Sequence, residues 1–197
     1  MTLTTANIIT VGRLFIAPIF LVFMMSDAPW ALTVAVLLFV VGAFSDWLDG
    51  WIARKLGEVT PQGEYLDPLA DKVLTTAAFV VFTIRDIMPF WMLLVIILRD
   101  FGTTALRSIA TDRGLAMKTS NGAKVKTFLQ MCFIVYALSL LWLRGNAPTS
   151  DIATQAGHLL YGDITYAVIL LITLFTLWTL VAYILSNRHL LRRGINN

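Results

Sequence analysis

The longest uncharged stretch of this 197-residue chain runs for 24 residues, from Ile164 to Asn187. A helix needs about 20 mainly apolar residues to cross the roughly 30 Å of hydrocarbon in a bilayer. Two other runs approach that length: Ala28–Ser45 has 18 uncharged residues, and Thr127–Leu143 has 17. Only 14% of the residues are charged, against about 25% in an ordinary globular domain. The sequence therefore predicts an integral membrane protein and excludes a disordered chain.

Three further uncharged runs have 12 residues each, at 14–25, 73–84 and 87–98. Each becomes long enough to cross a membrane only if the helix includes charged residues at one end. We therefore expect an all-α membrane protein that forms a single domain over residues 1–197. Its six transmembrane helices are predicted at about 6–25, 29–55, 65–85, 88–111, 121–144 and 155–187.

The distribution of basic residues predicts how these helices are oriented. Six helices place both termini on one side, and with the N-terminus inside, 13 of the 15 Lys and Arg residues lie inside. Only Arg85 and Arg144 then lie outside, so the positive-inside rule predicts cytoplasmic termini. The first helix is expected to be retained rather than cleaved as a signal peptide. The net charge of +3 suits an anionic membrane surface, and we expect no nucleic-acid partner.

Four aspartates form a pattern across the end of the second predicted helix and the start of the third. Asp46 and Asp49 are spaced i, i+3, and Asp67 and Asp71 are spaced i, i+4, so each pair lies on one helical stripe. The two helices are expected to be antiparallel neighbours, and both stripes then face one cavity at the inner leaflet. A fifth aspartate, Asp100, lies within the fourth predicted helix.

Four ionised carboxylates in one low-dielectric cavity need compensating cations. Oxygen ligands with no nearby His or Cys favour Mg²⁺ or Mn²⁺ over zinc, and four carboxylates can bridge two such ions. Gly50 and Ala53 continue the first stripe and leave room for a bulky ligand. The alternative is that each aspartate is a helix cap or a surface residue. Four acids at helical spacing on two membrane helices favour the metal site.

Residues 46–71 read D-x(2)-D-G-x(2)-A-R-x(8)-G-x(3)-D-x(3)-D. This text resembles the signature of the CDP-alcohol phosphotransferase family, with eight fixed residues over 26 positions. The resemblance implies a membrane enzyme that transfers a phosphatidyl group from a CDP-linked lipid to an alcohol and releases CMP. It also implies a homodimer.

The resemblance assigns roles to individual residues. Asp46, Asp49 and Asp67 would hold one metal ion, Asp46, Asp67 and Asp71 would hold the second, and Asp71 would also be the general base. The N-terminal text N-x-x-T-x-x-R resembles an element of many members, although Ala6 replaces a frequent proline. For Arg54, a positive-inside anchor is the alternative role. The predicted CDP-lipid-binding residues are Asn7, Thr10, Gly50, Ala53, Arg54 and Thr60.

A basic set between the fourth and fifth predicted helices suggests an acceptor that carries a phosphate. The alternative is a solvated inner rim that merely follows the charge bias. The text A-L-R at 105–107, K-x-K-T at 124–127 and D-P-L-A-D-K at 67–72 resembles bacterial phosphatidylglycerophosphate synthases. That likeness implies transfer from CDP-diacylglycerol to sn-glycerol 3-phosphate, in a bacterial inner membrane with the active site facing the cytoplasm. The predicted acceptor-phosphate residues are Arg99, Arg107, Lys124 and Lys126.

Other functions stay open at this point. The same fold could use another acceptor, as a cardiolipin synthase acting on phosphatidylglycerol or a phosphatidylinositol-phosphate synthase would. An intramembrane prenyltransferase also uses Asp-rich motifs and Mg²⁺, but it generally needs a longer chain. A cation transporter would spread its acids through the membrane instead of gathering them near one face. The single cysteine, Cys132, excludes a disulfide framework and is expected to be a small buried residue.

Overall fold

The computed structural model describes the backbone of residues 5–56, 61–112 and 121–195, and the side chains of residues 12–45, 72–108, 110–111 and 122–187. Within these ranges the chain forms helices and no strand, which confirms the predicted all-helical class. The helices are α1 (Thr5–Met25), α2 (Ala31–Leu56), α3 (Pro61–Ile84), α4 (Phe90–Asp112), α5 (Asn121–Asn146), α6 (Ser150–Leu160) and α7 (Asp163–Ile195).

The first five helices begin and end within four residues of the predicted positions. The largest difference is at α3, which begins at Pro61 instead of residue 65. Proline suits the first position of a helix, because its missing N–H has no intrahelical partner there and its fixed φ is already helical. The earlier start adds a turn before Asp67.

The predicted sixth helix, 155–187, is wrong in its form. The structure divides this segment into the short α6 and the long α7, with a break at Tyr161 and Gly162. A side chain does not fit at Gly162, because a Cβ atom there would lie 2.5 Å from the backbone oxygen of His158. Asp163 then begins α7, where a negative charge interacts favourably with the helix dipole. With 11 residues, α6 is about 16 Å long and does not span a bilayer.

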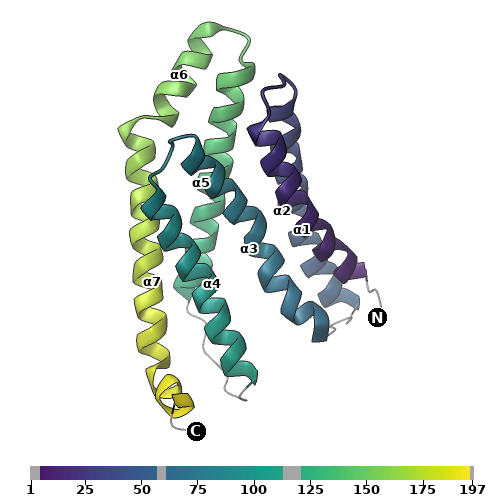
Figure 1. Cartoon of the computed structure of the whole chain (residues 1–197), viewed down its shortest axis with the longest axis vertical. Coiled ribbons are helices and arrows are strands. Elements are labelled where there is room, and N and C mark those ends of the chain that lie inside the picture. Colours follow the sequence, from purple (N-terminus) through teal and green to yellow (C-terminus); the bar gives the residue numbers. More distant parts are fainter. Residues whose placement is uncertain (1–4, 57–60, 113–120, 196–197) are drawn as a thin grey trace.

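The long helices pack as a bundle in which α3 and α5 connect two groups (Figure 1). On one side α1 packs against α2 and α3, and on the other α7 packs against α4 and α5. Aromatic side chains fill the junction: the Phe82 ring meets Phe79 and Phe133 edge-on, with centroids 6.0 and 5.9 Å apart. Such contacts add to the stability gained by burying large rings.

The links α1–α2, α3–α4 and α5–α6 all lie at one end of the bundle, the upper end in Figure 1. Arg85 and Arg144, the two cations predicted to lie outside, are both at this end. Arg85 donates a hydrogen bond of 2.6 Å to the backbone oxygen of Met24 and so caps α1, and Arg144 lies 4.9 Å from the ring centre of Tyr161. The start of α1 and the end of α7 lie at the opposite end.

The outer surface of the bundle is strongly apolar. On α7, for example, Leu171 and Trp178 are 65% and 60% exposed. Within the described chain, two segments are long and apolar enough to cross a membrane. They are Gly122–Asn146, which belongs to α5, and Ser150–Asn187, which comprises α6 and most of α7. Exposed apolar side chains of this size are typical of helices that face lipid.

Gly42 of α2 allows α1, α2 and α3 to approach closely. A Cβ atom at this position would lie 2.6 Å from Leu74 Cδ2 and 3.4 Å from Ile16 Cγ2, and Leu74 is itself buried. Small residues serve the same purpose where membrane helices cross.

We therefore expect Gly42→Val to destabilise the protein by about 1–3 kcal/mol, the usual effect of overpacking a filled core. Thermal unfolding of the purified protein in detergent measures this effect. Gly102→Val is the matched control, because a Cβ atom at Gly102 has no neighbour within 4 Å. Equal unfolding temperatures for the two variants would show that the bundle absorbs the added side chain at Gly42.

Candidate active site

The four predicted metal ligands lie on two helices that contact each other. Asp46 and Asp49 belong to the last turns of α2, and Asp67 and Asp71 belong to α3. The helical backbone therefore gives both pairs the i, i+3 and i, i+4 spacing on which the predicted stripes depend. The side chains of these four residues lie outside the described part of the structure.

The predicted CDP-lipid-binding residues are distributed over the same region. Gly50, Ala53 and Arg54 are in α2, one to two turns beyond the first aspartates. Asn7 and Thr10 are in α1, and Thr60 lies in the segment 57–60, outside the described residues. The side chains of all these residues lie outside the described part too, so their roles stay predictions.

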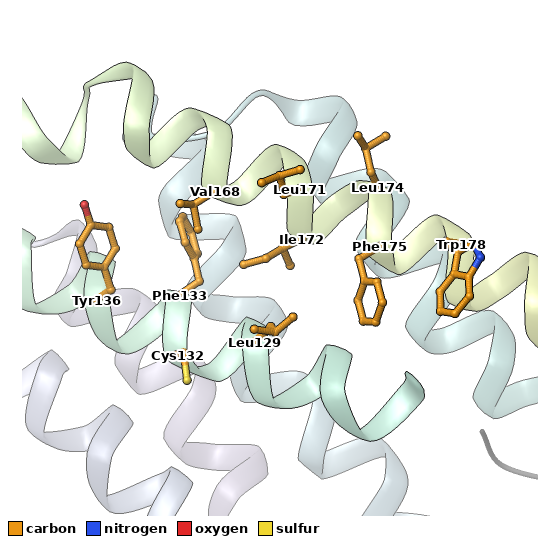
Figure 2. A pocket seen from close by; sticks show the side chains of 10 residues that line it. All are labelled: Leu129, Cys132, Phe133, Tyr136, Val168, Leu171, Ile172, Leu174, Phe175 and Trp178. Atoms are coloured by element: carbon orange, nitrogen blue, oxygen red, sulfur yellow. The ribbon is translucent and has the colours of Figure 1, made fainter. Parts of the chain in front are cut away.

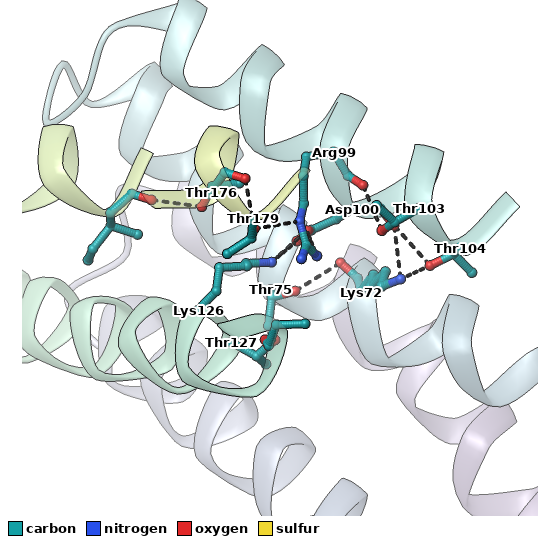
Figure 3. Close-up of polar contacts among 12 residues, drawn as sticks. Lys72, Thr75, Arg99, Asp100, Thr103, Thr104, Lys126, Thr127, Thr176 and Thr179 are labelled. Carbon is teal, nitrogen blue, oxygen red and sulfur yellow. Dashed lines mark hydrogen bonds and ion pairs between the residues drawn. The ribbon is translucent and has the colours of Figure 1, made fainter. Parts of the chain in front are cut away.

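A buried ionic cluster formed by Arg99, Asp100 and Lys126 joins α4 to α5 (Figure 3). Lys126 Nζ donates to both carboxylate oxygens of Asp100, at 2.5 and 2.7 Å, and Arg99 donates to one of them at 3.1 Å. Each of the three residues is at most 7% exposed. The cluster explains why an apolar helix contains Asp100, since the carboxylate holds two cations from different helices.

Polar contacts extend the cluster to α7 and α3. Arg99 Nε donates to Thr179 Oγ1 of α7 at 3.3 Å. From α3, Lys72 Nζ donates to the backbone oxygen of Asp100 at 2.9 Å and to Thr104 Oγ1. Because Lys72 directly follows Asp71 in the chain, these contacts connect the helix of the second acid pair to the cluster (Figure 3).

The described side chains of the cluster do not balance in charge. Arg99 and Lys126 share the single carboxylate of Asp100, so these three buried side chains together carry one positive charge in excess. An uncompensated charge away from water is costly, and ionisable groups inside membrane proteins are typical of functional sites. This arrangement suits an anionic ligand.

The structure separates the four predicted acceptor-phosphate residues into two kinds. Arg99 and Lys126 are buried and joined through Asp100, whereas Arg107 and Lys124 are exposed near the ends of α4 and α5. The exposed pair flanks segment 113–120, which lies outside the described residues. Among the described side chains, Arg99 and Lys126 are the pair that shares a buried carboxylate.

Two buried polar residues of α5 and α7 were not predicted as candidate site residues. Thr179 of α7 and Gln130 of α5 are polar residues on long apolar helices, and both are buried. A polar residue within a predicted membrane helix was the available signal, because such residues usually face the interior of the bundle. Lys72 entered the sequence analysis only as the last residue of the text D-P-L-A-D-K.

An apolar groove of about 810 Å³ lies along the side chains of α5 and α7 (Figure 2). Phe133, Ile172, Phe175 and Trp178 are among its lining residues, and no charged residue is among them. Cys132 also lines it and is exposed, so the predicted burial of this cysteine is wrong. Cys132 lies on the surface of α5, where it contributes to the lining of the groove.

Comparison with known proteins agrees with the resemblance in the sequence. A profile of the family described as CDP-alcohol phosphatidyltransferase matches residues 3–186. The CDP-diacylglycerol–glycerol-3-phosphate 3-phosphatidyltransferase of Bacillus subtilis strain 168 is 36% identical over 154 residues, which cover 72% of this chain and 77% of the relative. The Pseudomonas fluorescens protein of the same name is 32% identical over 181 residues, covering 90% and 87%.

A probable phosphatidylglycerophosphate synthase of Mycobacterium tuberculosis strain H37Rv is 32% identical over 163 residues, which cover 81% of this chain and 77% of the relative. The chain belongs to the CDP-alcohol phosphatidyltransferase family, since the family profile matches nearly its whole length. It is accordingly a phosphatidyltransferase enzyme.

Proposed function

We propose that this enzyme transfers the phosphatidyl group of CDP-diacylglycerol to sn-glycerol 3-phosphate and releases phosphatidylglycerophosphate and CMP. The names of the relatives support this reaction. The structural observation that carries the choice of acceptor is the buried cluster in which Arg99 and Lys126 exceed the charge of Asp100. A phosphomonoester of charge about −1.5 to −2 compensates that excess, whereas serine, choline or ethanolamine brings no such anion.

The membrane arrangement is part of the proposal. The six long helices, α1 to α5 and α7, have 21 to 33 residues and are each at least as long as a bilayer's hydrocarbon core is thick. The end that carries Arg85 and Arg144 faces outward, and both termini and the active site face the cytoplasm of a bacterial inner membrane. A homodimer, implied by the family resemblance, stays a prediction.

Two divalent cations, Mg²⁺ or Mn²⁺, are proposed as cofactors of the four aspartates. The described side chains contain no group of three or more His, Cys, Asp or Glu residues that could hold a metal ion, and the proposed ligands are the aspartates of α2 and α3. Four carboxylates at helical spacing on two contacting helices supply the oxygen ligands that such ions prefer. When bound, the ions would neutralise the pyrophosphate of the CDP-lipid.

The other side chains of the proposed site transfer a proton and bind the two substrates. Asp71 takes the proton from the attacking hydroxyl of glycerol 3-phosphate, the 1-hydroxyl at the carbon remote from the phosphate. Gly50, Arg54 and Thr60 hold the cytidine nucleotide and its phosphates, and Arg54 supplies a cation beside the pyrophosphate. Lys126 and Arg99 hold the phosphate of the acceptor. The lipid tails stay in the bilayer while the soluble acceptor enters from the cytoplasm.

Release of CMP by the purified protein tests this assignment. With CDP-diacylglycerol and Mg²⁺ or Mn²⁺, we expect turnover with glycerol 3-phosphate, and little or none with inositol phosphate or phosphatidylglycerol. Chelation of the metal should abolish turnover, and its return should restore it. Faster turnover with inositol phosphate or phosphatidylglycerol would show that glycerol 3-phosphate is not the preferred acceptor. Turnover that continues after chelation would show that the reaction does not need the proposed metal ions.

A further inference from the structure

The side chain of Gln130 on α5 is buried without any hydrogen-bond partner for its Nε2 atom in the described structure. The residue is only 4% exposed. A buried polar group that lacks a partner is rare and costly, and it calls for an explanation.

Other buried polar residues on the long helices show what is usual in this protein. Thr173 donates to the backbone oxygen of Ile169 at 2.8 Å, and Asn187 donates to that of Tyr183 at 2.9 Å. Each therefore satisfies its own donor one turn back along its helix. The amide of Gln130 does not use the corresponding oxygen, that of Lys126, so its donor stays available to another group.

The position of Gln130 relates this free donor to the buried cations. Gln130 follows Lys126 by four residues on α5, so the two residues lie on the same face of the helix. Side chains on a helix lean toward its N-terminus, which directs the amide of Gln130 toward the turn of Lys126. Lys126 is 2% exposed and bonded to Asp100, so the face is polar and enclosed at this depth.

We propose that Gln130 binds the acceptor substrate, with its side-chain N–H donating to an oxygen of the phosphorylated polyol that Lys126 and Arg99 hold. The inference rests on the proposed function. A neutral amide donor gives the site a selectivity that the two cations do not provide. The cations attract any anion, whereas an enclosed hydrogen-bond donor selects a ligand that places an oxygen at one particular point.

The variant Gln130→Met tests this role, because methionine has a similar length and volume but no donor. Loss of one hydrogen bond is expected to raise the KM for glycerol 3-phosphate about tenfold. The KM for CDP-diacylglycerol should stay within about twofold of the wild-type value, because the amide contacts the other substrate. Without substrates, the variant should unfold at the same temperature as the wild type or at a higher one, because it no longer buries an unpaired amide.

Gln155→Met is the matched control, since Gln155 is exposed on α6 at the far end of the bundle. It should change neither KM nor the unfolding temperature. A lower unfolding temperature for Gln130→Met with an unchanged KM for glycerol 3-phosphate would overturn the proposal and make the amide structural. A rise in the KM for CDP-diacylglycerol alone would also overturn it.

The wild-type enzyme separates this inference from the function on which it rests. If the wild type does not turn over glycerol 3-phosphate, the proposed function fails and the acceptor contact fails with it. If the wild type turns it over and Gln130→Met keeps the wild-type KM for both substrates, only the inference about Gln130 fails.

Discussion

Replacing Asp71 with asparagine is expected to lower the rate of CMP release at saturating substrates by about 10²- to 10⁴-fold, the usual contribution of a general base. Asparagine keeps the shape of the side chain but cannot accept the proton of the attacking hydroxyl. It also removes one negative charge from the proposed metal site, so the loss should lie toward the upper part of this range. Single-turnover and steady-state assays of CMP release measure it.

Folding and nucleotide binding separate a catalytic loss from general damage. The Asp71→Asn protein should unfold at a temperature close to that of the wild type and should still bind a cytidine nucleotide. Asp27→Asn is the control, because Asp27 is exposed in the link between α1 and α2 and the substitution is identical. If Asp71→Asn keeps the wild-type rate of CMP release, Asp71 is not the general base.

The helices were predictable where charge or proline interrupts the apolar pattern. Pro29 and Pro89, for example, lie in the links before α2 and α4. The break before α7 was missed because the predicted helix was extended back to residue 155, across Gly162 and the charged Asp163 that mark the break. The lack of space for a side chain at Gly162 depends on the backbone oxygen of His158, and a periodic pattern does not contain that information.

The candidate site was predictable in its composition and only partly in its contacts. The aspartates of α2 and α3 follow a spacing that a sequence displays directly. The ionic cluster joins residues that are distant in the chain: Lys126 lies 26 residues from Asp100, and Thr179 lies 80 residues from Arg99. The sequence therefore assigns no role to Asp100, because that role depends on the packing of α4 against α7 and on the reach of the Lys126 side chain from α5.

The balance of charge in this cluster gives the largest expected effects on stability. Asp100→Asn leaves Arg99 and Lys126 buried as neighbours with no carboxylate between them. Loss of one partner of a buried ion pair commonly costs about 3–5 kcal/mol, and two stranded cations place this variant at the upper end. Lys126→Met leaves Arg99 and Asp100 as a balanced pair, so its stability should stay near that of the wild type.

If Lys126 holds the phosphate of the acceptor, Lys126→Met should impair acceptor binding although it leaves the stability of the protein nearly unchanged. A hydrogen bond to a charged group contributes about 1.5–3 kcal/mol, so Lys126→Met should raise the KM for glycerol 3-phosphate by about 10- to 100-fold. Thermal unfolding and the KM for each substrate, measured on the same preparations, separate the two effects. For stability, Lys124→Met is the control, since Lys124 is exposed two residues earlier on α5.

These measurements decide between a structural and a functional reason for the excess charge. A functional cluster predicts that Lys126→Met folds well and binds the acceptor poorly, because the extra cation is present for a ligand. A structural cluster predicts that Lys126→Met unfolds as easily as Asp100→Asn and keeps its KM for glycerol 3-phosphate. In that case the acceptor phosphate would have to be held by the exposed pair, Arg107 and Lys124, because the buried cations would serve only to hold α4 against α5.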